Sequence, residues 1–300
     1  AGGVDYFSHC DPAGTHDLFE GDQEVHRMGY LTDLISERAC AVIERQRASD
    51  RPFLVSVHYT APHWPWETRD DREESARIHG KIVHLDGGSL ATYHTMIHHM
   101  DEGIGRIRRA LASIGASDDT LIVFTSDNGG ERFSDNWPLV GGKMDLLEGG
   151  IRVPYIAHWP ARIAPGGVSR QHLITMDWAP TMLAAAGVAQ SPDHPMDGID
   201  LAPALADPAH CAERALFWRM KYKSQRAMRE GRWKYLAMDG SDFLFDIEID
   251  ARERANLAGR QPERVAAMRE RWEVWERTMP PLPDDARVSL VYDRTTLAQP

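Results

Sequence analysis

The sequence predicts an α/β domain over residues 1–205 and a small α+β subdomain over residues 206–300. In the first range, apolar stripes at helical spacing alternate with short, continuous apolar runs of strand type. After the Pro- and Asp-rich stretch at 191–208, strand-like runs follow one another without intervening helices. The first pattern usually folds as a mostly parallel sheet with helices on both faces, and the second favours an antiparallel sheet.

Apolar side chains three or four positions apart predict the helices of the first domain, and short apolar runs predict its strands. Helices are expected at 29–48, at 93–114 and around 177–187. Strands are expected at 52–60, 120–127 and 153–160.

Strands of the second part are expected at 215–220, 233–238 and 243–247. A last helix should begin near Pro262, because proline is favoured in the first helical turn. Its apolar positions should cover one face of the antiparallel sheet; they are Val265, Met268, Trp272 and Trp275.

Composition excludes several classes of protein. The 300 residues hold 34 Lys and Arg against 45 Asp and Glu, a net charge of −11, so the sequence predicts neither a nucleic-acid binder nor an anionic-membrane binder. No apolar run approaches the roughly 18 to 20 residues of a spanning helix. The three cysteines lack zinc spacing, and neither they nor the visible amino terminus, which has no signal core, decides the compartment. The oligomeric state is equally open.

The segment LIVFTSDNGGE at 121–131 ends an apolar run in Asp127 and Asn128, followed by two glycines. Ligands of open α/β sheets bind at the carboxyl ends of strands. Carboxylate and amide oxygens are the hard donors that Ca²⁺ and Mg²⁺ prefer. The same residues also form a common turn sequence, so this segment alone leaves a metal site and a plain turn as alternatives.

Lys143 follows two glycines, and a second glycine pair follows Glu148. A lysine on such a loop can bind a sulfate or phosphate oxygen as a point charge. The loop is not a phosphate-binding Walker motif, because Met144 stands where Ser or Thr is required. The alternative is an ordinary solvated lysine.

His63 lies between two prolines after the expected strand 52–60, with Trp64 and Trp66 beside it. A histidine at a strand's carboxyl end can act as a general acid or donate to an anionic oxygen. The alternative is a loop imidazole that packs against tryptophan.

Together these three segments resemble the sulfatases, the formylglycine-dependent branch of the alkaline phosphatase superfamily, whose pattern contains APH, SDNG, G-K and EGG-x-R-x-P. Further segments resemble sulfatases in the expected order: DYFSH at 5–9, GYLTDL at 29–34, MDEGIGRI at 100–107, MDWAPTML at 176–183, DGIDLAPAL at 197–205 and GRWKYL at 231–236. The resemblance covers nearly the whole chain. It implies an alkaline-phosphatase-like fold and hydrolysis of sulfate esters of small molecules or glycans.

The resemblance also implies a divalent cation, usually Ca²⁺ with Mg²⁺ as the alternative, held by Asp127 and Asn128 and by two further aspartates of the family. Lys143 and His63 would contact the sulfate and the bridging ester oxygen, with His63 as proton donor to the departing alcohol. Asp127 would accept a proton from the formylglycine hydrate. These four side chains are expected to gather around one bound oxyanion.

The sequence departs from the family in its nucleophile. The cysteine that becomes formylglycine lies in C-x-P-x-R, but Cys10 is followed by Asp-Pro-Ala-Gly, and Cys40 and Cys211 lack even the proline. The family's adjacent aspartates are absent as well. We therefore expect the carboxy-terminal portion of a longer enzyme or a truncated product, without its nucleophile and with half a metal site.

Two alternatives to a sulfatase stay open at this point. One is a non-catalytic sulfatase remnant or binding protein, and the other is a phosphatase or phosphonate ester hydrolase of the same superfamily. A zinc site at His94 and His98, one helical turn apart, is weaker because no third ligand completes it. We expect these two histidines on the polar face of the helix, with His99 on another face.

Overall fold

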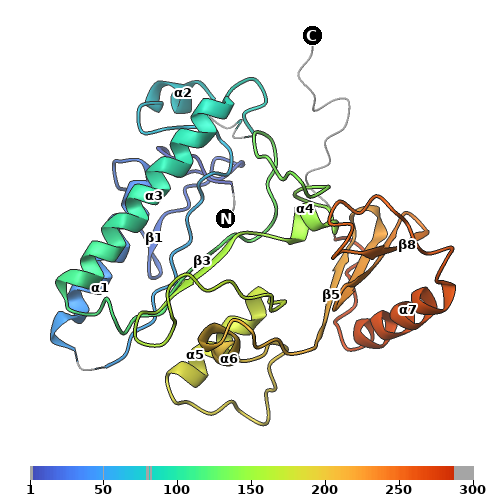
Figure 1. Cartoon of the computed structure of the whole chain (residues 1–300). Coiled ribbons are helices and arrows are strands. Elements are labelled where there is room, and N and C mark those ends of the chain that lie inside the picture. Colours follow the sequence, from blue (N-terminus) through green and yellow to red (C-terminus); the bar gives the residue numbers. More distant parts are fainter. Residues whose placement is uncertain (1–2, 50, 79–80, 82, 287–300) are drawn as a thin grey trace. The chain divides into compact units, whose positions relative to one another are not determined.

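The computed structural model describes residues 3–49, 51–78, 81 and 83–286. They belong to two compact units, a first one up to Asp119 and a second one from Thr120 (Figure 1). The expected division into domains 1–205 and 206–300 stays a prediction. None of the helices in the described ranges combines the length and the apolarity needed to cross a bilayer.

Two packed helices dominate the first unit, α1 (Leu31–Glu44) and α3 (Leu90–Ser113), which lie side by side in Figure 1. They confirm the helices expected at 29–48 and 93–114. A Cβ atom on Gly103 would lie 2.2 Å from Ser36 Oγ, so this glycine permits the close approach of α3 to α1. The unit also contains the short helices η1 (Arg45–Ala48) and α2 (Arg72–Arg77) and the hairpin of β1 (Phe19–Glu20) and β2 (Gln23–Glu24).

The strand expected at 52–60 is not formed, and the prediction is wrong for this segment. No strand is assigned to residues 51–60, and the side chain of Leu54 is 70% exposed. A strand exists only when its backbone groups bond to a neighbouring strand, and none of the described strands pairs with this segment. The apolar residues of this segment indicated a strand buried in a sheet. The described residues provide no neighbouring strand for it, so the strand does not form.

In the second unit, β3 (Ile122–Thr125) pairs with β4 (Tyr155–His158). They confirm the strands expected at 120–127 and 153–160. All strand pairs within the described ranges are antiparallel, whereas mostly parallel pairing was expected. The connection from β3 to β4 contains only the four-residue helix α4 (Glu148–Ile151), and not the long crossover helix that usually joins parallel strands.

The second unit continues with short helices and ends in a four-stranded antiparallel sheet. The helices are η2 (Thr175–Asp177), α5 (Trp178–Ala185), α6 (Ala202–Ala206) and η3 (Tyr222–Ser224). The strands are β5 (Ala215–Met220), β6 (Gln225–Glu230), β7 (Trp233–Met238) and β8 (Ser241–Asp246), in that order. This sheet confirms the antiparallel sheet expected in this part of the chain, with β6 as an additional strand.

Helix α7 (Pro262–Glu276) covers one face of the sheet, as expected (Figure 1). Its buried residues Val265, Met268 and Trp272 pack on Met228 and Tyr235 of the strands. The opposite face of the sheet carries a second apolar cluster; its buried members are Leu146, Ala227, Leu236, Phe245 and Ile247. Because Leu146 precedes α4, the sheet supports the loop that follows Lys143.

In the first unit, Glu67 is a fully buried carboxyl group beside the equally enclosed Asp5. The backbone N–H of Tyr6 donates to Glu67 Oε2 at 3.2 Å. Burial, and next the negative charge of Asp5, raise the pKa of Glu67 to about 9. The carboxyl is therefore protonated in the folded chain at neutral pH.

The free energy of unfolding should consequently fall as the pH rises from about 5 to 9, because the unfolded carboxyl releases its proton near its ordinary pKa while the folded one keeps it. The contribution is complete below the unfolded pKa and is lost as the pH approaches 9. Its limiting slope is about 1.4 kcal/mol per pH unit. Urea titrations at pH 6 and 8 should show a smaller loss of stability in Glu67→Gln than in the wild type. The exposed control Glu73→Gln should behave like the wild type, and an unchanged slope in Glu67→Gln contradicts the assignment.

Candidate active site

Asp127 and Asn128 lie in the loop that directly follows β3 in the second unit. The Ser126 hydroxyl donates to the backbone carbonyl of Asn128 at 3.1 Å, and Asn128 Nδ2 donates to the carbonyl of Gly129 at 3.1 Å. The amide nitrogen of Asn128 is thereby used within the loop. Its amide oxygen and the exposed carboxylate of Asp127 are the oxygen donors at the end of β3.

Backbone hydrogen bonds join this loop to the loop of Lys143. The Lys143 N–H donates to the carbonyl of Gly130 at 3.0 Å, and the Gly129 N–H donates to the carbonyl of Gly150 at 2.8 Å. The side chain of Asn136 accepts from the Gly130 N–H at 3.2 Å and donates to the Gly141 carbonyl at 3.1 Å. Asp127, Asn128 and Lys143 therefore come from loops that form one hydrogen-bonded assembly.

The glycines of these loops allow backbone to touch backbone. A Cβ atom on Gly129 would lie 1.7 Å from the carbonyl oxygen of Gly149. One on Gly150 would lie 2.0 Å from the carbonyl oxygen of Asp145. Neither glycine has a positive φ, so close approach rather than backbone conformation explains glycine at these two positions, whereas Gly141 has a positive φ of 82°.

The side chain of Lys143 is largely enclosed, with 18% of it exposed. Its Nζ lies 3.5 Å from Glu131 Oε2, and the Glu131 side chain is 16% exposed. Glu131 Oε1 is buried without a hydrogen-bond partner. These values exclude the solvated-lysine alternative, and they identify Glu131, which the sequence interpretation did not single out, as the carboxylate beside Lys143.

A buried cluster of charged side chains holds the Lys143 loop at Glu148. Lys234 of β7 is completely buried, with Nζ at 3.0 Å from Glu148 Oε1 and at 2.8 Å from Glu253 Oε1. Glu253 Oε2 accepts from the backbone N–H of Glu148 at 2.6 Å, and Arg229 Nη1 lies 3.3 Å from Glu148 Oε2. Burial tends to raise the pKa of Glu148, but the charges of Lys234 and Arg229 outweigh it and lower that pKa.

For a divalent cation, Asp127 and Asn128 provide the correct type of donor but only part of a ligand set. Ca²⁺ takes about six to eight oxygen ligands. Among the described residues, the one group of three His, Cys, Asp or Glu side chains close enough to share an ion does not include Asp127. The pair fits a cation whose remaining ligands come from elsewhere, as the sequence predicts for half a metal site.

His63 belongs to the first unit, where its loop is firmly held. Its Nδ1 lies 2.9 Å from the carbonyl oxygen of Trp64, and its ring lies 4.1 Å from the Trp64 ring. Because a carbonyl can only accept, the hydrogen bond puts a proton on Nδ1. The Tyr6 hydroxyl donates to the His63 carbonyl at 2.9 Å. The His63 ring packs against tryptophan, as one of the two interpretations of the sequence predicted. The chemical role of His63 stays a prediction.

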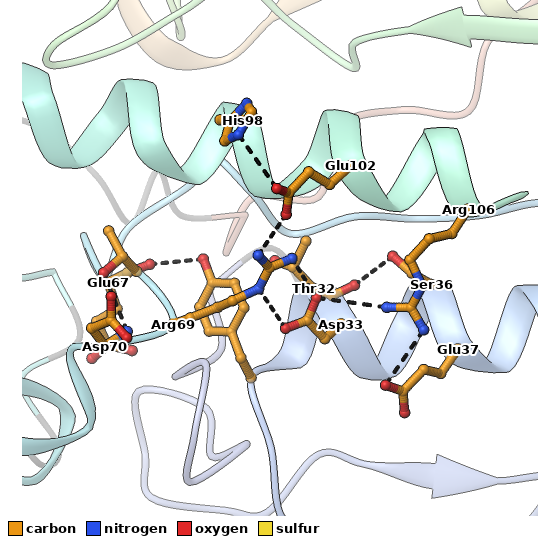
Figure 2. Close-up of polar contacts among 12 residues, drawn as sticks. Thr32, Asp33, Ser36, Glu37, Glu67, Arg69, Asp70, His98, Glu102 and Arg106 are labelled. Atoms are coloured by element: carbon orange, nitrogen blue, oxygen red, sulfur yellow. Dashed lines mark hydrogen bonds and ion pairs between the residues drawn. The ribbon is translucent and has the colours of Figure 1, made fainter.

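Arg69 anchors the chain just after this loop, as Figure 2 shows. Its guanidinium donates twice to Asp33 of α1, at 2.7 and 2.8 Å, and once to Glu102 of α3, at 2.5 Å. His98 Nε2 lies 3.4 Å from the same Glu102. Such a bidentate pair fixes geometry as well as charge, so the segment of His63 is fastened to both helices of its unit.

Among the described residues, the group of side chains close enough to share a metal ion does not include His94 or His98, so the weaker zinc candidate gains no third ligand there. His94 and His98 are exposed on α3 and His99 is buried, which confirms the predicted polar face.

Comparison with known proteins covers nearly the whole chain. The sulfatase family model matches residues 2–188, and a model described as N-sulphoglucosamine sulphohydrolase, C-terminal, matches residues 142–273. The uncharacterized sulfatase YdeN of Escherichia coli is 30% identical over 68% of this chain and 37% of its own length. The N-acetylgalactosamine-6-sulfatase of Canis lupus familiaris is 32% identical over 63% of this chain and 35% of its own length. The chain thus spans about a third of the length of these curated relatives.

Solved structures agree with the sequence comparison. A crystal structure of Ps i-CgsB in complex with k-i-k-neocarrahexaose is 29% identical, with a TM-score of 0.73, and the match covers 85% of this chain and 56% of that one. The fold is accordingly the alkaline-phosphatase-like fold of sulfatases. With its family model matched over more than half of its residues, this chain belongs to the sulfatase family.

Proposed function

We propose that the chain provides metal-binding and sulfate-binding residues of a sulfuric ester hydrolase. The observation that supports this most strongly is the hydrogen-bonded assembly of the two glycine-rich loops. It puts the oxygen donors Asp127 and Asn128 and the enclosed ammonium group of Lys143 on one rigid support. An oxygen-rich cation site next to a lysine suits a sulfate ester, whose charge grows on the bridging oxygen as the alcohol leaves.

Asp127 and Asn128 would hold a divalent cation, Ca²⁺ in the family's usual form, which neutralises sulfate charge when bound. None of the cysteines of this chain stands in C-x-P-x-R, so the formylglycine nucleophile of the family is not encoded in these 300 residues. Activity therefore requires a form of the enzyme that contains that segment.

Lys143 would bind a sulfate oxygen and stabilise the charge that develops during cleavage. His63 would donate a proton to the leaving alcohol. Since Nδ1 keeps its proton in the hydrogen bond to the Trp64 carbonyl, the transferred proton would come from Nε2 of the doubly protonated, cationic ring. Such a general acid works best with a pKa near the operating pH.

The substrate we propose is a sulfate ester of a glycan or a small molecule. The names of two similar proteins support this class, since one is an N-acetylgalactosamine-6-sulfatase and the other was solved with k-i-k-neocarrahexaose. Neither name identifies the sugar or the position of the sulfate for this chain.

Comparing matched aryl sulfate and aryl phosphate esters tests the proposal. A form of the enzyme with the C-x-P-x-R segment should cleave the sulfate with kcat/KM at least about tenfold above that for the phosphate. The 300-residue chain alone should show no turnover. A preference for phosphate overturns the sulfatase assignment in favour of a phosphatase. A folded, complete form that cleaves neither ester overturns it in favour of a binding protein.

A further inference from the structure

Three potential metal ligands meet beside the β1–β2 hairpin of the first unit. His16, Glu24 and His26 each offer one ligand atom, and these atoms all lie within 4.8 Å of one another. Glu24 Oε1 lies 3.0 Å from His16 Nδ1 and 3.6 Å from His26 Nε2. The two imidazole rings are 4.3 Å apart. The carboxylate oxygen thus lies close to a nitrogen of each ring.

Backbone contacts set these positions in advance. His16 forms a β-bridge with Cys10, and Glu24 pairs with Phe19 in the hairpin. The N–H of Val25, between Glu24 and His26, donates to the carbonyl of Leu18 at 2.9 Å. The ligands are therefore attached to a fixed frame rather than to an open loop, which lowers the conformational cost of binding an ion.

The contact between His16 and Glu24 lacks the geometry of an ordinary hydrogen bond. His16 Nδ1 is buried and has no hydrogen-bond partner, although the Glu24 oxygen is only 3.0 Å away. The His16 side chain is 14% exposed, so water reaches it poorly. A buried ring nitrogen close to a carboxylate oxygen, without a shared hydrogen, is stabilised by a cation that both atoms can bind.

The spacing fits a tetrahedral ion. Ligands at about 2.0 to 2.2 Å from a tetrahedral centre lie about 3.3 to 3.6 Å from each other. Of the two distances from Glu24 Oε1, 3.6 Å lies at the upper end of this range and 3.0 Å lies slightly below it, so a small shift of the carboxylate brings both into the range. Two imidazoles and one carboxylate favour Zn²⁺ and similar transition metals over Ca²⁺ and Mg²⁺, which prefer oxygen ligands alone.

We propose that His16, Glu24 and His26 bind one Zn²⁺ ion, with water as the fourth ligand. The site differs in ligand type from the oxygen donors Asp127 and Asn128, and it does not depend on the proposed hydrolase activity. Its effect is to join the segment of His16 to the end of the hairpin. Because the ion binds the folded chain, Zn²⁺ should raise the midpoint of thermal unfolding.

Metal titration of the full chain, after removal of any tag and treatment with chelator, tests the site. Calorimetry should show one Zn²⁺ per chain, and Co²⁺ should give the intense visible absorption of a tetrahedral ion. His26→Ala and Glu24→Gln should each weaken Zn²⁺ binding at least about tenfold, because each removes a ligand. The His26 side chain is 77% exposed, so its replacement should leave the fold intact, which far-UV circular dichroism checks.

The matched control is His94→Ala on α3, an exposed histidine outside the cluster, and it should bind Zn²⁺ as the wild type does. Equal loss of affinity in His94→Ala and His26→Ala overturns the proposal. So does unchanged affinity in both His26→Ala and Glu24→Gln, because the contact is then an ion pair only. A thiolate-to-cobalt absorption band overturns the ligand set, since it would assign the metal to a cysteine.

Discussion

Replacing Lys143 with alanine should lower the turnover of an aryl sulfate by about 100- to 10,000-fold in an enzyme form that contains the C-x-P-x-R segment. The reason is the position of the ammonium group. It is mostly enclosed beside Glu131 and attached to the loop of Asp127 and Asn128, where little water can replace its charge. Most of the loss should appear in kcat, because charge on the ester oxygen grows during cleavage.

Folding effects can be separated from this loss of catalysis. Lys143→Ala leaves the Glu131 carboxylate partly buried without its cation, so the variant should also be somewhat less stable. The double variant Lys143→Ala/Glu131→Gln should regain stability but not turnover. The exposed lysine of the first unit, replaced in Lys81→Ala, is the matched control and should keep full turnover. Wild-type kcat in Lys143→Ala rejects the assigned role.

A parallel test applies to His63. His63→Ala should lower turnover within the same range, about 100- to 10,000-fold, if its imidazole protonates the leaving alcohol. The loss should shrink for esters with acidic leaving alcohols, which depart without a proton. An equal loss for every leaving group indicates a positioning role for the ring instead.

Local sequence patterns predicted the regular elements well, because helices and hairpins depend on nearby residues. The helix expected at 93–114 is α3, which begins earlier because the Ser89 hydroxyl caps it by accepting the N–H of Thr92. The strands expected at 215–220 and 233–238 have the bounds of β5 and β7. The sequence of β6, QRAMRE, lacks an apolar run, so its pattern did not reveal a strand.

Features that depend on distant partners could not be predicted in the same way. Gln225 shows this within β6, since its side chain accepts from the backbone N–H of Leu146 at 2.8 Å and donates to the carbonyl of Met144 at 2.9 Å. The two residues that the Gln225 side chain contacts lie about 80 positions earlier in the chain, so the sequence around Gln225 does not reveal these hydrogen bonds. The segment 52–60 shows the opposite error, because its apolar run predicted a strand for which the described residues provide no neighbour.

The candidate site shows the same difference between features that local sequence determines and features that depend on distant residues. Motifs identified Asp127, Asn128, Lys143 and His63 as residues with chemical potential, since those types stand in recognisable local segments. They gave no indication of Glu131 or of the ion cluster around Lys234. Charged residues are usually exposed, and the sequence does not show which of them are paired and buried. The EGG and GRWKYL segments of the family pattern meet in that cluster, where Glu148 contacts Lys234.

The ion cluster leads to the second large effect, on stability. Lys234→Met should lower the free energy of unfolding by about 3 to 5 kcal/mol, because it leaves the carboxylates of Glu148 and Glu253 buried without their shared cation. Burial already raises the pKa of Glu253 despite the nearby ammonium group. Urea denaturation followed by circular dichroism measures the loss.

Two further variants test whether this loss of stability comes from the burial of the charges or only from the removal of an ion pair. Arg271→Met removes the cation of an exposed pair with Glu230, whose side chains are 48% and 45% exposed, and should cost at most about 1 kcal/mol. Lys234→Met/Glu253→Gln should recover part of the stability, because only Glu148 then stays charged, with Arg229 as its partner. A cost for Lys234→Met no larger than that of the exposed pair contradicts the cluster.

Since Glu148 begins α4 beside the glycines that contact Gly129, loss of Lys234 should also loosen the loops of Asp127 and Lys143. Lys143→Ala/Glu131→Gln instead removes activity from a stable fold, and this contrast separates support of the site from its chemistry.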